Sequence, residues 1–399
     1  MAEGPPGVRR RGVLRATGLA LLAAPLGCAA RAPAALDAAG AQRLLDQRAR
    51  ELLAPARGAR PADPLSARLA RVPLRSWTYR VTSVSTDATG ERATVRADLD
   101  HRIAGHDPAP VTTARSLALR RGPDRWHVTA ERPAPGARPG LWDHGPVDVV
   151  HGTRTLVLGT ARGEEHRTEL TRLAALADRA VEEVGTAWGG DWRRRLLVVV
   201  PGSPEAMAAL LGEPAAGYRG IAAVTTGRRG PGPADRIVVN PEAYRELSAF
   251  GRRIVLTHEA THVATRAHTS ARTPMWLSEG YADWAAHRAE PAGPALRRRA
   301  PALARAVRAA RVPERLPTDA DFGFGNDPER LARAYEGAWL ACRLVADHWG
   351  RPRLNALYRA VDAARPGAGA VEAVLDEVLG VTTAELTARW RARLLRDLG

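Results

Sequence analysis

The sequence predicts an α+β protein with two structured parts behind an N-terminal export segment. Two changes of hydrophobic period support this prediction. Between Ser76 and Thr129, apolar residues recur at every second position in several runs, which is typical of half-buried strands. From Leu247 onward they recur at helical spacing, with short breaks. A chain of 399 residues is also long enough to build two separate cores.

The formal net charge of +16 is carried by arginine, because the sequence contains no lysine. A basic surface can bind nucleic acid or anionic polymers. Beyond the N-terminal segment the arginines are scattered, however, with only short runs at 193–195 and 297–299. No nucleic-acid motif accompanies them. We therefore interpret them as solvated faces and expect no nucleic-acid partner, although binding to an anionic polymer remains an alternative that rests on charge alone.

Residues 1–28 read as a targeting segment rather than as part of the fold. Arg9–Arg11 are followed by an apolar run, Val13–Leu26, that is too short to span a membrane. The segment Arg10–Arg15, which begins with two arginines, resembles a twin-arginine export signal. Leu26-Gly27-Cys28 resembles a bacterial lipobox, which implies that Cys28 is lipidated and anchors the protein at the outer face of the cytoplasmic membrane. The alternative is secretion without an anchor.

The first structured part, 29–135, is expected to be a helix followed by a curved antiparallel sheet. Leu36–Leu53 has amphipathic helical spacing, and four alternating segments follow it, with turn residues between them: 77–84, 93–99, 113–119 and 125–129. This order resembles the cystatin-like or nuclear-transport-factor-like cone. His101, His106 and His127 form no catalytic set and are expected at the surface or lining the cone.

The Pro/Gly-rich segment 133–139 predicts a linker to a second part, 141–399. Strands are expected at 153–159, 195–201, 220–225 and 236–240, with helices at 164–187 and 204–211. Helices are also expected at 247–266, 276–289, 294–311, 328–349, 352–363, 371–379 and 383–398. Residues 321–326 form a loop that could overhang a cleft. Cys342, the only cysteine besides Cys28, lies in an apolar helix and is expected in the core.

A His-Glu-x-x-His motif at 258–262 predicts a zinc site. His258 and His262 lie four apart on one helical face, so both imidazoles can meet one ion. Glu259 lies about 100° round the helix, where a carboxylate can act as a base. Glu279, on a second apolar stretch, can supply the third protein ligand. The alternative is an ordinary helix with solvated histidines, but apolar residues flank both segments.

At these residues the chain resembles the gluzincin metallopeptidases, the thermolysin-like group. The shared motif is His-Glu-x-x-His followed by Trp-Leu-x-Glu-Gly-x-Ala. The resemblance implies a zincin-type domain in which His258, His262 and Glu279 bind Zn²⁺ and Glu259 is the general base. It also implies that Asp283 hydrogen-bonds the first histidine, as carboxylates beside metal-bound histidines do. In that family the strand before the motif helix is the sheet edge on which substrate pairs, which points to 236–240. The alternative for that strand is a plain core strand.

The expected function is therefore a zinc-dependent peptidase that cleaves peptide or protein substrates at the outer cell envelope. The alternative is an envelope-anchored binding module with a structural or weakly active zinc site, and the intact Glu259 argues against it. Related aminopeptidases place an oxyanion-stabilising tyrosine on a helix beyond the ligand glutamate, and Tyr335 resembles it. The alternatives are that Tyr335 only packs its ring, or that His268 or Tyr281 is the donor. The sequence does not predict the oligomeric state.

Overall fold

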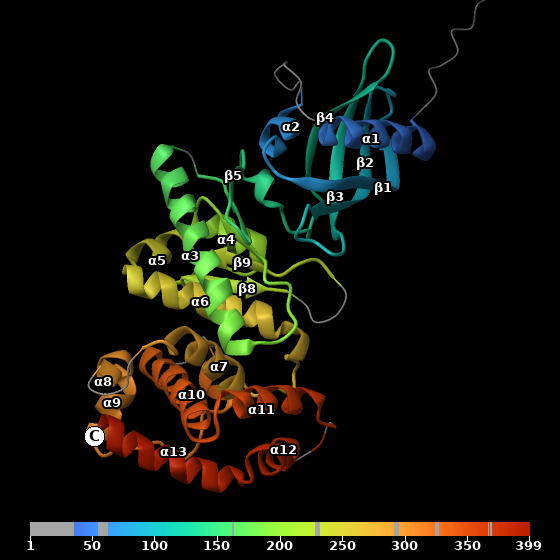
Figure 1. The fold of residues 1–399 in the computed structure, drawn as a ribbon. Coiled ribbons are helices and arrows are strands. Elements are labelled where there is room, and N and C mark those ends of the chain that lie inside the picture. Colours follow the sequence, from blue (N-terminus) through green and yellow to red (C-terminus); the bar gives the residue numbers. More distant parts are fainter. Residues whose placement is uncertain are drawn as a thin grey trace, which may run out of the picture. The chain divides into compact units, whose positions relative to one another are not determined.

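The computed structural model describes residues 36–54, 63–161, 163–227, 232–290, 295–323, 327–365, 367 and 369–399. Residues Leu36–Gly399 form one compact unit. An antiparallel sheet comes first along the chain, and a mixed sheet with helices follows it (Figure 1). This confirms the predicted mixture of an antiparallel sheet with a second, mixed sheet and helices.

The antiparallel sheet has the strand order β1-β2-β3-β4. Its strands are β1 (Leu74–Thr86), β2 (Arg92–Ile103), β3 (Val111–Arg121) and β4 (Trp126–Pro133). The helix α1 (Ala38–Leu53) lies across the sheet (Figure 1), and α2 (Pro64–Leu69) follows it. Ala41, Leu45 and Ala49 of α1 are buried at four-residue spacing, so one face of the helix covers the apolar side of the sheet.

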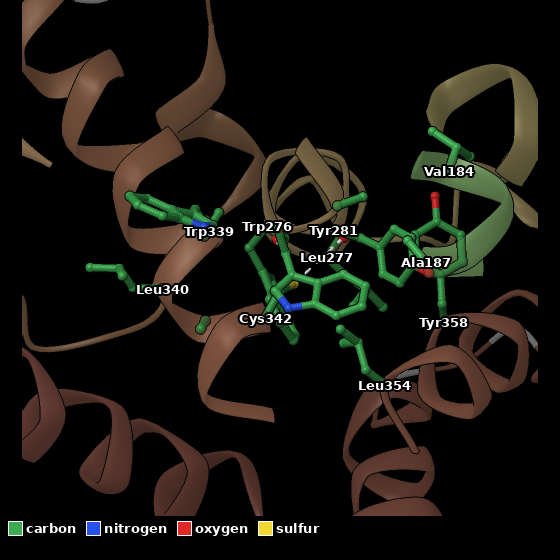
Figure 2. Packing of buried hydrophobic residues seen from close by; sticks show 14 of the residues in the cluster. Val184, Ala187, Trp276, Leu277, Tyr281, Trp339, Leu340, Cys342, Leu354 and Tyr358 are labelled. Atoms are coloured by element: carbon green, nitrogen blue, oxygen red, sulfur yellow. Dashed lines mark hydrogen bonds between the residues drawn. The ribbon is translucent and has the colours of Figure 1, made fainter. Parts of the chain in front are cut away.

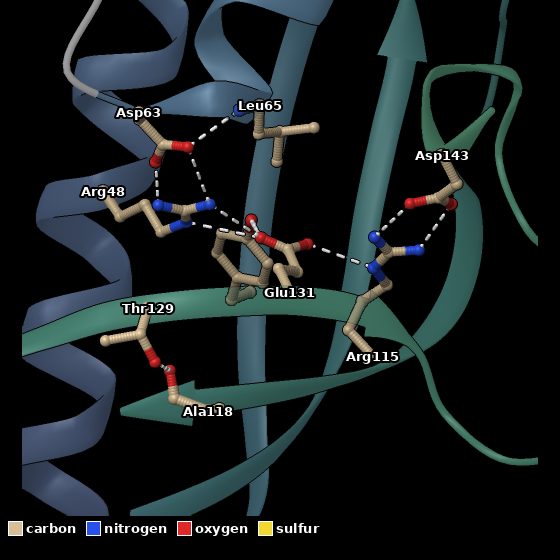
Figure 3. A network of polar contacts seen from close by, with 9 residues as sticks. Arg48, Asp63, Leu65, Arg115, Ala118, Thr129, Glu131 and Asp143 are labelled. Carbon is tan, nitrogen blue, oxygen red and sulfur yellow. Dashed lines mark hydrogen bonds and ion pairs between the residues drawn. The ribbon is translucent and has the colours of Figure 1, made fainter. Parts of the chain in front are cut away.

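A network of charged side chains joins α1 to the sheet (Figure 3). The carboxylate of Glu131 accepts hydrogen bonds from Arg48 Nη2 at 3.1 Å, Tyr79 Oη at 2.8 Å and Arg115 Nε at 3.0 Å. The remaining guanidinium nitrogens of Arg115 bind both oxygens of Asp143 at 2.8 Å. Arg48 also pairs with the carboxylate of Asp63. Each charge in this network therefore faces an opposite charge.

The mixed sheet has the order β5-β6-β7-β9-β8. β6 (Thr155–Gly159), β7 (Leu196–Val200) and β9 (Arg236–Val239) are parallel. β5 (Asp148–His151) and β8 (Ala223–Thr226) pair antiparallel with them at the two ends. All five residues of β7 are buried, as expected for a strand that is covered on both faces.

One face of the mixed sheet packs on two long helices. The helices α3 (Glu164–Trp188) and α6 (Ala249–Thr265) share a core with Val157, Val198 and Ile237 of the sheet. The alternate residues Leu158, Leu197 and Val199 belong to a second core cluster, together with buried residues of α4 (Pro204–Leu211) and of the antiparallel sheet. The short helix α5 (Pro241–Glu246) precedes α6.

Helices make up most of the chain beyond α6. They are α7 (Met275–His287), α8 (Ala295–Arg299), α9 (Pro301–Arg308), α10 (Pro328–Trp349), α11 (Arg351–Ala363), α12 (Ala370–Leu379) and α13 (Thr383–Leu398). The single helix expected at 294–311 is wrong, because α8 ends at Arg299 and α9 begins at Pro301. A proline ring lacks an N–H and clashes with the preceding turn, so it starts helices and does not continue them. Of the expected loop 321–326, Asp321 and Phe322 close a short 3₁₀ turn and 324–326 lie outside the described residues.

Two further differences from the sequence expectations concern the mixed sheet. The strand β5 was not expected, because Asp148–His151 is too short to show a period. The expectation that 236–240 is the sheet edge is wrong, since β9 lies between β7 and β8. The strand at the end of the sheet is β8, and the alternative of a core strand holds for β9. The boundaries expected for two domains, 29–135 and 141–399, stay a prediction.

Candidate metal centre

The helix α6 presents the histidine pair. Ser248 caps its start, where the side-chain oxygen accepts a hydrogen bond from the Gly251 amide at 3.2 Å. Leu256, Ala260 and Ala264 recur at four-residue spacing and are buried in the core. This stripe fixes the rotation of the helix, so that the side chains of His258 and His262 come together on a neighbouring face.

The helix α7 supplies the carboxylates. It follows Pro274, and its first amide, at Met275, donates to Oδ1 of Asp319 at 2.8 Å. Glu279 and Asp283 lie four residues apart on the face of α7 that looks toward the histidines. At Gly280, between them, an added Cβ would collide with the backbone carbonyl of Ala338 on α10. Glycine therefore lets the backbones of α7 and α10 approach closely enough to position Glu279.

Three ligand atoms from the two helices converge. His258 Nε2 lies 3.1 Å from His262 Nε2 and 3.3 Å from Glu279 Oε2. His262 Nε2 lies 3.6 Å from the same Glu279 oxygen. Ligands at about 2.0–2.1 Å from a tetrahedral zinc lie about 3.4 Å apart from one another. His258, His262 and Glu279 therefore fit a zinc ion both in donor type and in spacing.

Asp283 fixes the orientation of the first imidazole. Its Oδ1 lies 2.8 Å from Nδ1 of His258, the distance of a hydrogen bond that the ring donates. With the proton on Nδ1, the lone pair of Nε2 faces Glu279 and His262, as a metal ligand requires. Burial alone would lower the pKa of His258, but Asp283 and Glu279 beside it raise that pKa well above its ordinary value. Burial would likewise raise the pKa of Glu279, and the two histidines hold it low.

Glu259 lines the same cleft as the three ligand residues and contacts β8, the strand next to β9 at one end of the mixed sheet. Its Oε2 accepts a hydrogen bond of 2.6 Å from the hydroxyl of Thr225 on β8. The same hydroxyl lies 3.1 Å from the backbone carbonyl oxygen of Glu259. Thr225 therefore sets the position of the carboxylate, and sequence reasoning missed it, because the contact joins residues 34 positions apart.

A cleft of about 740 Å³ opens over these residues. Its lining includes the segment Ala216–Thr225 except Tyr218, which runs into β8, and Pro328, Leu331 and Tyr335 of α10. His258, Glu259, His262, Glu279 and Asp283 line it as well. The cleft thus exposes the three ligand atoms and Glu259 to one shared space that is large enough for a small molecule or a peptide segment.

Tyr335 lines this cleft, whereas Tyr281 and His268, the alternative hydrogen-bond donors, do not. Burial raises the pKa of Tyr335, and Glu279, Asp283 and Glu259 nearby raise it further. Its ring packs edge-on against Phe322 at 5.2 Å. Tyr281 is buried and donates its hydroxyl proton to Asn355 at 2.7 Å, and the ring of His268 lies 5.6 Å from that of Trp188. Among the described residues that line the cleft, neither Tyr281 nor His268 occurs.

Buried side chains hold α7 against its neighbours (Figure 2). Leu277 and Tyr281 point from α7 into the core, where Cys342 of α10 and Tyr358 of α11 meet them. Asn355 accepts from Tyr281 and donates to the carbonyl oxygens of Ala187 and Trp188, at the end of α3. The helices that carry the ligands are therefore fixed by packing on two sides, and the expectation that Cys342 is a core residue is confirmed.

The predicted site residues of the second part of the chain all meet at this cleft, namely His258, Glu259, His262, Glu279, Asp283 and Tyr335. Cys28, the predicted lipidation site, lies outside the described residues. No helix in the described ranges is long and apolar enough to cross a membrane. The chain matches no known protein-family model, and no curated protein resembles it significantly.

Proposed function

We propose that the chain is a zinc-dependent peptidase of the gluzincin type. The convergence of His258, His262 and Glu279 on one point, with Glu259 beside them in an open cleft, is the observation that carries the proposal. A structural zinc site is closed by four protein ligands, whereas a catalytic site keeps one position open. Three donors and an adjacent carboxylate that is not a ligand fit the catalytic arrangement. The finer architecture, a cone-shaped first part and a zincin-type second part, belongs to the same proposal.

His258, His262 and Glu279 would hold the ion, which when bound lowers the pKa of water and polarises a carbonyl. Glu259 then takes a proton from the attacking water and delivers it to the leaving amine. The hydroxyl of Thr225 keeps the carboxylate of Glu259 in place for both transfers. Tyr335 donates a hydrogen bond to the carbonyl oxygen as negative charge develops on it.

The strand β8 is the proposed binding edge for an extended peptide. It lies at the end of the mixed sheet, and Ala223, Val224 and Thr225 line the cleft. An extended chain can pair with the free edge of such a strand through backbone hydrogen bonds. Because Thr225 contacts Glu259, a peptide bound along β8 passes directly over the base. Peptide or protein substrates therefore fit the cleft best.

The proposed location is the outer cell envelope. It rests on the sequence of residues 1–28, with the twin-arginine-like segment and Cys28 as the lipid anchor, and secretion without an anchor is the alternative.

The test compares the purified parent protein with one variant of the proposed base and one variant of a proposed zinc ligand. Glu259→Ala should retain one zinc per chain and lose peptide cleavage by about 10²–10⁴-fold, because Glu259 moves protons and does not bind the ion. His262→Ala should lose the zinc as well as the activity. Zinc content by elemental mass spectrometry and cleavage of a mixed peptide library, with and without a chelator, provide the readouts. A Glu259→Ala variant that cleaves at the parental rate would refute the mechanism, and a zinc-free parent would refute the metal centre.

A further inference from the structure

A second cavity, of about 410 Å³, is separate from the cleft and shares no lining residue with it. Its walls are largely apolar and include Ile103 of β2, Leu158 of β6 and Val199 of β7. Each of these side chains is buried. Cavities of this volume with apolar walls are the usual setting of a small-molecule site.

An aromatic cluster contributes two residues to the lining of the cavity. The rings of Trp77, His101 and Trp142 lie 4.8–5.7 Å apart, centre to centre. His101 and Trp142 line the cavity, whereas Trp77 does not. Nδ1 of His101 and both indole nitrogens are buried without a hydrogen-bond partner. Three ring nitrogens thus lack a partner within one cluster, although buried polar groups in proteins are normally hydrogen-bonded.

The charges around the cavity are compensated or exposed. Arg236 forms hydrogen bonds of 2.7 and 2.9 Å to the carboxylate of Asp107, whose side chain is fully buried. Arg138, the other arginine of the lining, is exposed to solvent. Burial lowers the pKa of His101 to about 4, so this ring is neutral at pH 7. Away from the exposed Arg138, the cavity therefore offers hydrogen-bond donors in a largely apolar space where the charge of Arg236 is already paired, which disfavours a charged guest.

Water alone is a poor occupant of this space. A buried water is held by two to four polar partners, and most of the wall area of this cavity is apolar. A molecule with an apolar body and one acceptor oxygen satisfies both parts of the cavity. Its body would replace water at the walls, and its oxygen would accept from the indole N–H of Trp142.

We propose that this cavity binds a neutral, largely apolar small molecule whose acceptor oxygen, a ketone or an ester carbonyl, is bound by Trp142 and His101. The proposal does not depend on the metal centre or on peptidase activity.

The test uses the full-length protein and the fluorescent ketone 6-propionyl-2-(dimethylamino)naphthalene, with an analogue that has CH₂ in place of the carbonyl. The ketone should bind with a blue shift of its emission, and the analogue should bind about 10-fold more weakly, because it cannot accept a hydrogen bond. Val199→Trp fills the cavity and should abolish binding of both probes. Absence of a blue shift with the parent protein would overturn the proposal, as would unchanged binding by Val199→Trp.

A matched pair of variants tests the donor. Trp142→Phe and Trp77→Phe each remove one unpartnered indole N–H from the same cluster, but only Trp142 lines the cavity. Trp142→Phe should weaken the ketone about 10-fold and leave the analogue unchanged, whereas Trp77→Phe should affect neither probe. Circular dichroism confirms that each variant is folded. Should Trp142→Phe fail to fold, His101→Phe takes its place, with the same expected loss for the ketone alone. Equal losses for the two tryptophan variants, or for the two probes, would overturn the proposal.

Discussion

Two clusters of partly buried ionisable groups differ in what their charged atoms face. Around Arg115, the guanidinium and the carboxylates of Glu131 and Asp143 face one another, and each guanidinium nitrogen meets an acceptor (Figure 3). At the metal centre, two imidazole nitrogens and a carboxylate oxygen face one point within 4.8 Å of each other. All three are acceptors when the histidines are neutral. The first cluster is complete by itself, whereas the second is balanced only when a proton on His258 or a metal ion is added.

Burial and charge alone therefore do not separate a structural cluster from a functional one. The side chain of Arg115 is 1 % exposed and that of Glu279 is 12 % exposed, so the structural cluster holds the more deeply buried group. The balance of donors and acceptors separates them. The predictions below test this contrast in order of decreasing expected effect.

Breaking the complete cluster should have the largest effect, and on stability. Arg115→Met leaves Asp143 without its bidentate partner, and removal of one member of a buried ion pair typically costs about 3–5 kcal/mol of unfolding free energy. Denaturant unfolding monitored by fluorescence measures the loss. Arg80→Met is the control, because Arg80 pairs with Asp98 at the surface and its removal should cost about 0–1 kcal/mol. Similar losses for both variants would contradict the assignment of Arg115 to a stabilising network.

Changes at the second cluster should affect function more than stability. Tyr335→Phe removes only a hydroxyl group at the cleft, so turnover should fall about 10²–10³-fold with little change in KM. Steady-state kinetics on the best substrate of the peptide library measure both constants. Tyr281→Phe is the matched control, since its hydroxyl bonds Asn355 in the core. Normal turnover by Tyr335→Phe would show that its ring only packs against Phe322.

Asp283 supports a ligand without being one. Asp283→Ala should leave the fold intact and weaken zinc binding about 10–100-fold, because the ring of His258 loses the acceptor that orients it. Competition with a chelator of known affinity gives the change. Asp283→Asn retains an acceptor oxygen and should fall between the parent and the alanine variant. An unchanged zinc affinity in Asp283→Ala would remove Asp283 from the metal centre.

The smallest effect is expected at Thr225. Thr225→Val keeps the shape of the side chain and removes the hydrogen bond to Glu259, so kcat should fall about 5–10-fold at unchanged zinc content. Thr225→Ser keeps the hydroxyl and should restore the rate. If the serine variant is as slow as the valine variant, packing of the threonine methyl group matters, and the hydroxyl does not.

The sequence predicted those parts of the site that depend on local spacing. His258 and His262 share a helical face whatever surrounds them. The place of Asp283 beside His258, in contrast, was only what the resemblance to the gluzincin metallopeptidases implied. The strands of the antiparallel sheet were also visible, because alternation of apolar residues reports burial on one face. Residue spacing along a single element therefore predicted the helices and strands, whereas the roles of the site residues stay predictions.

Contacts between elements that are distant in the chain could not be predicted from the sequence. The place of β8 at one end of the sheet depends on which strands pair, and β8 and β9, of four residues each, are too short to reveal their order. The hydrogen bond between Thr225 and Glu259 follows from that order, so it was missed with it. The unpartnered nitrogens of Trp77, His101 and Trp142 likewise appear only when three separate segments meet.

Gly280 has a mechanical consequence for the cleft. Because no side chain separates α7 from α10 at this position, the two backbones touch, and neither helix can slide or tilt without carrying the other. Glu279 on α7 and Tyr335 on α10 therefore belong to one rigid block, and α6 packs against α7 within it. We therefore expect any widening that admits a bulky chain to come from the lining segment 216–225, where 219–222 form neither helix nor strand. We expect segment 216–225 to move when a substrate enters and α7 and α10 to keep their positions.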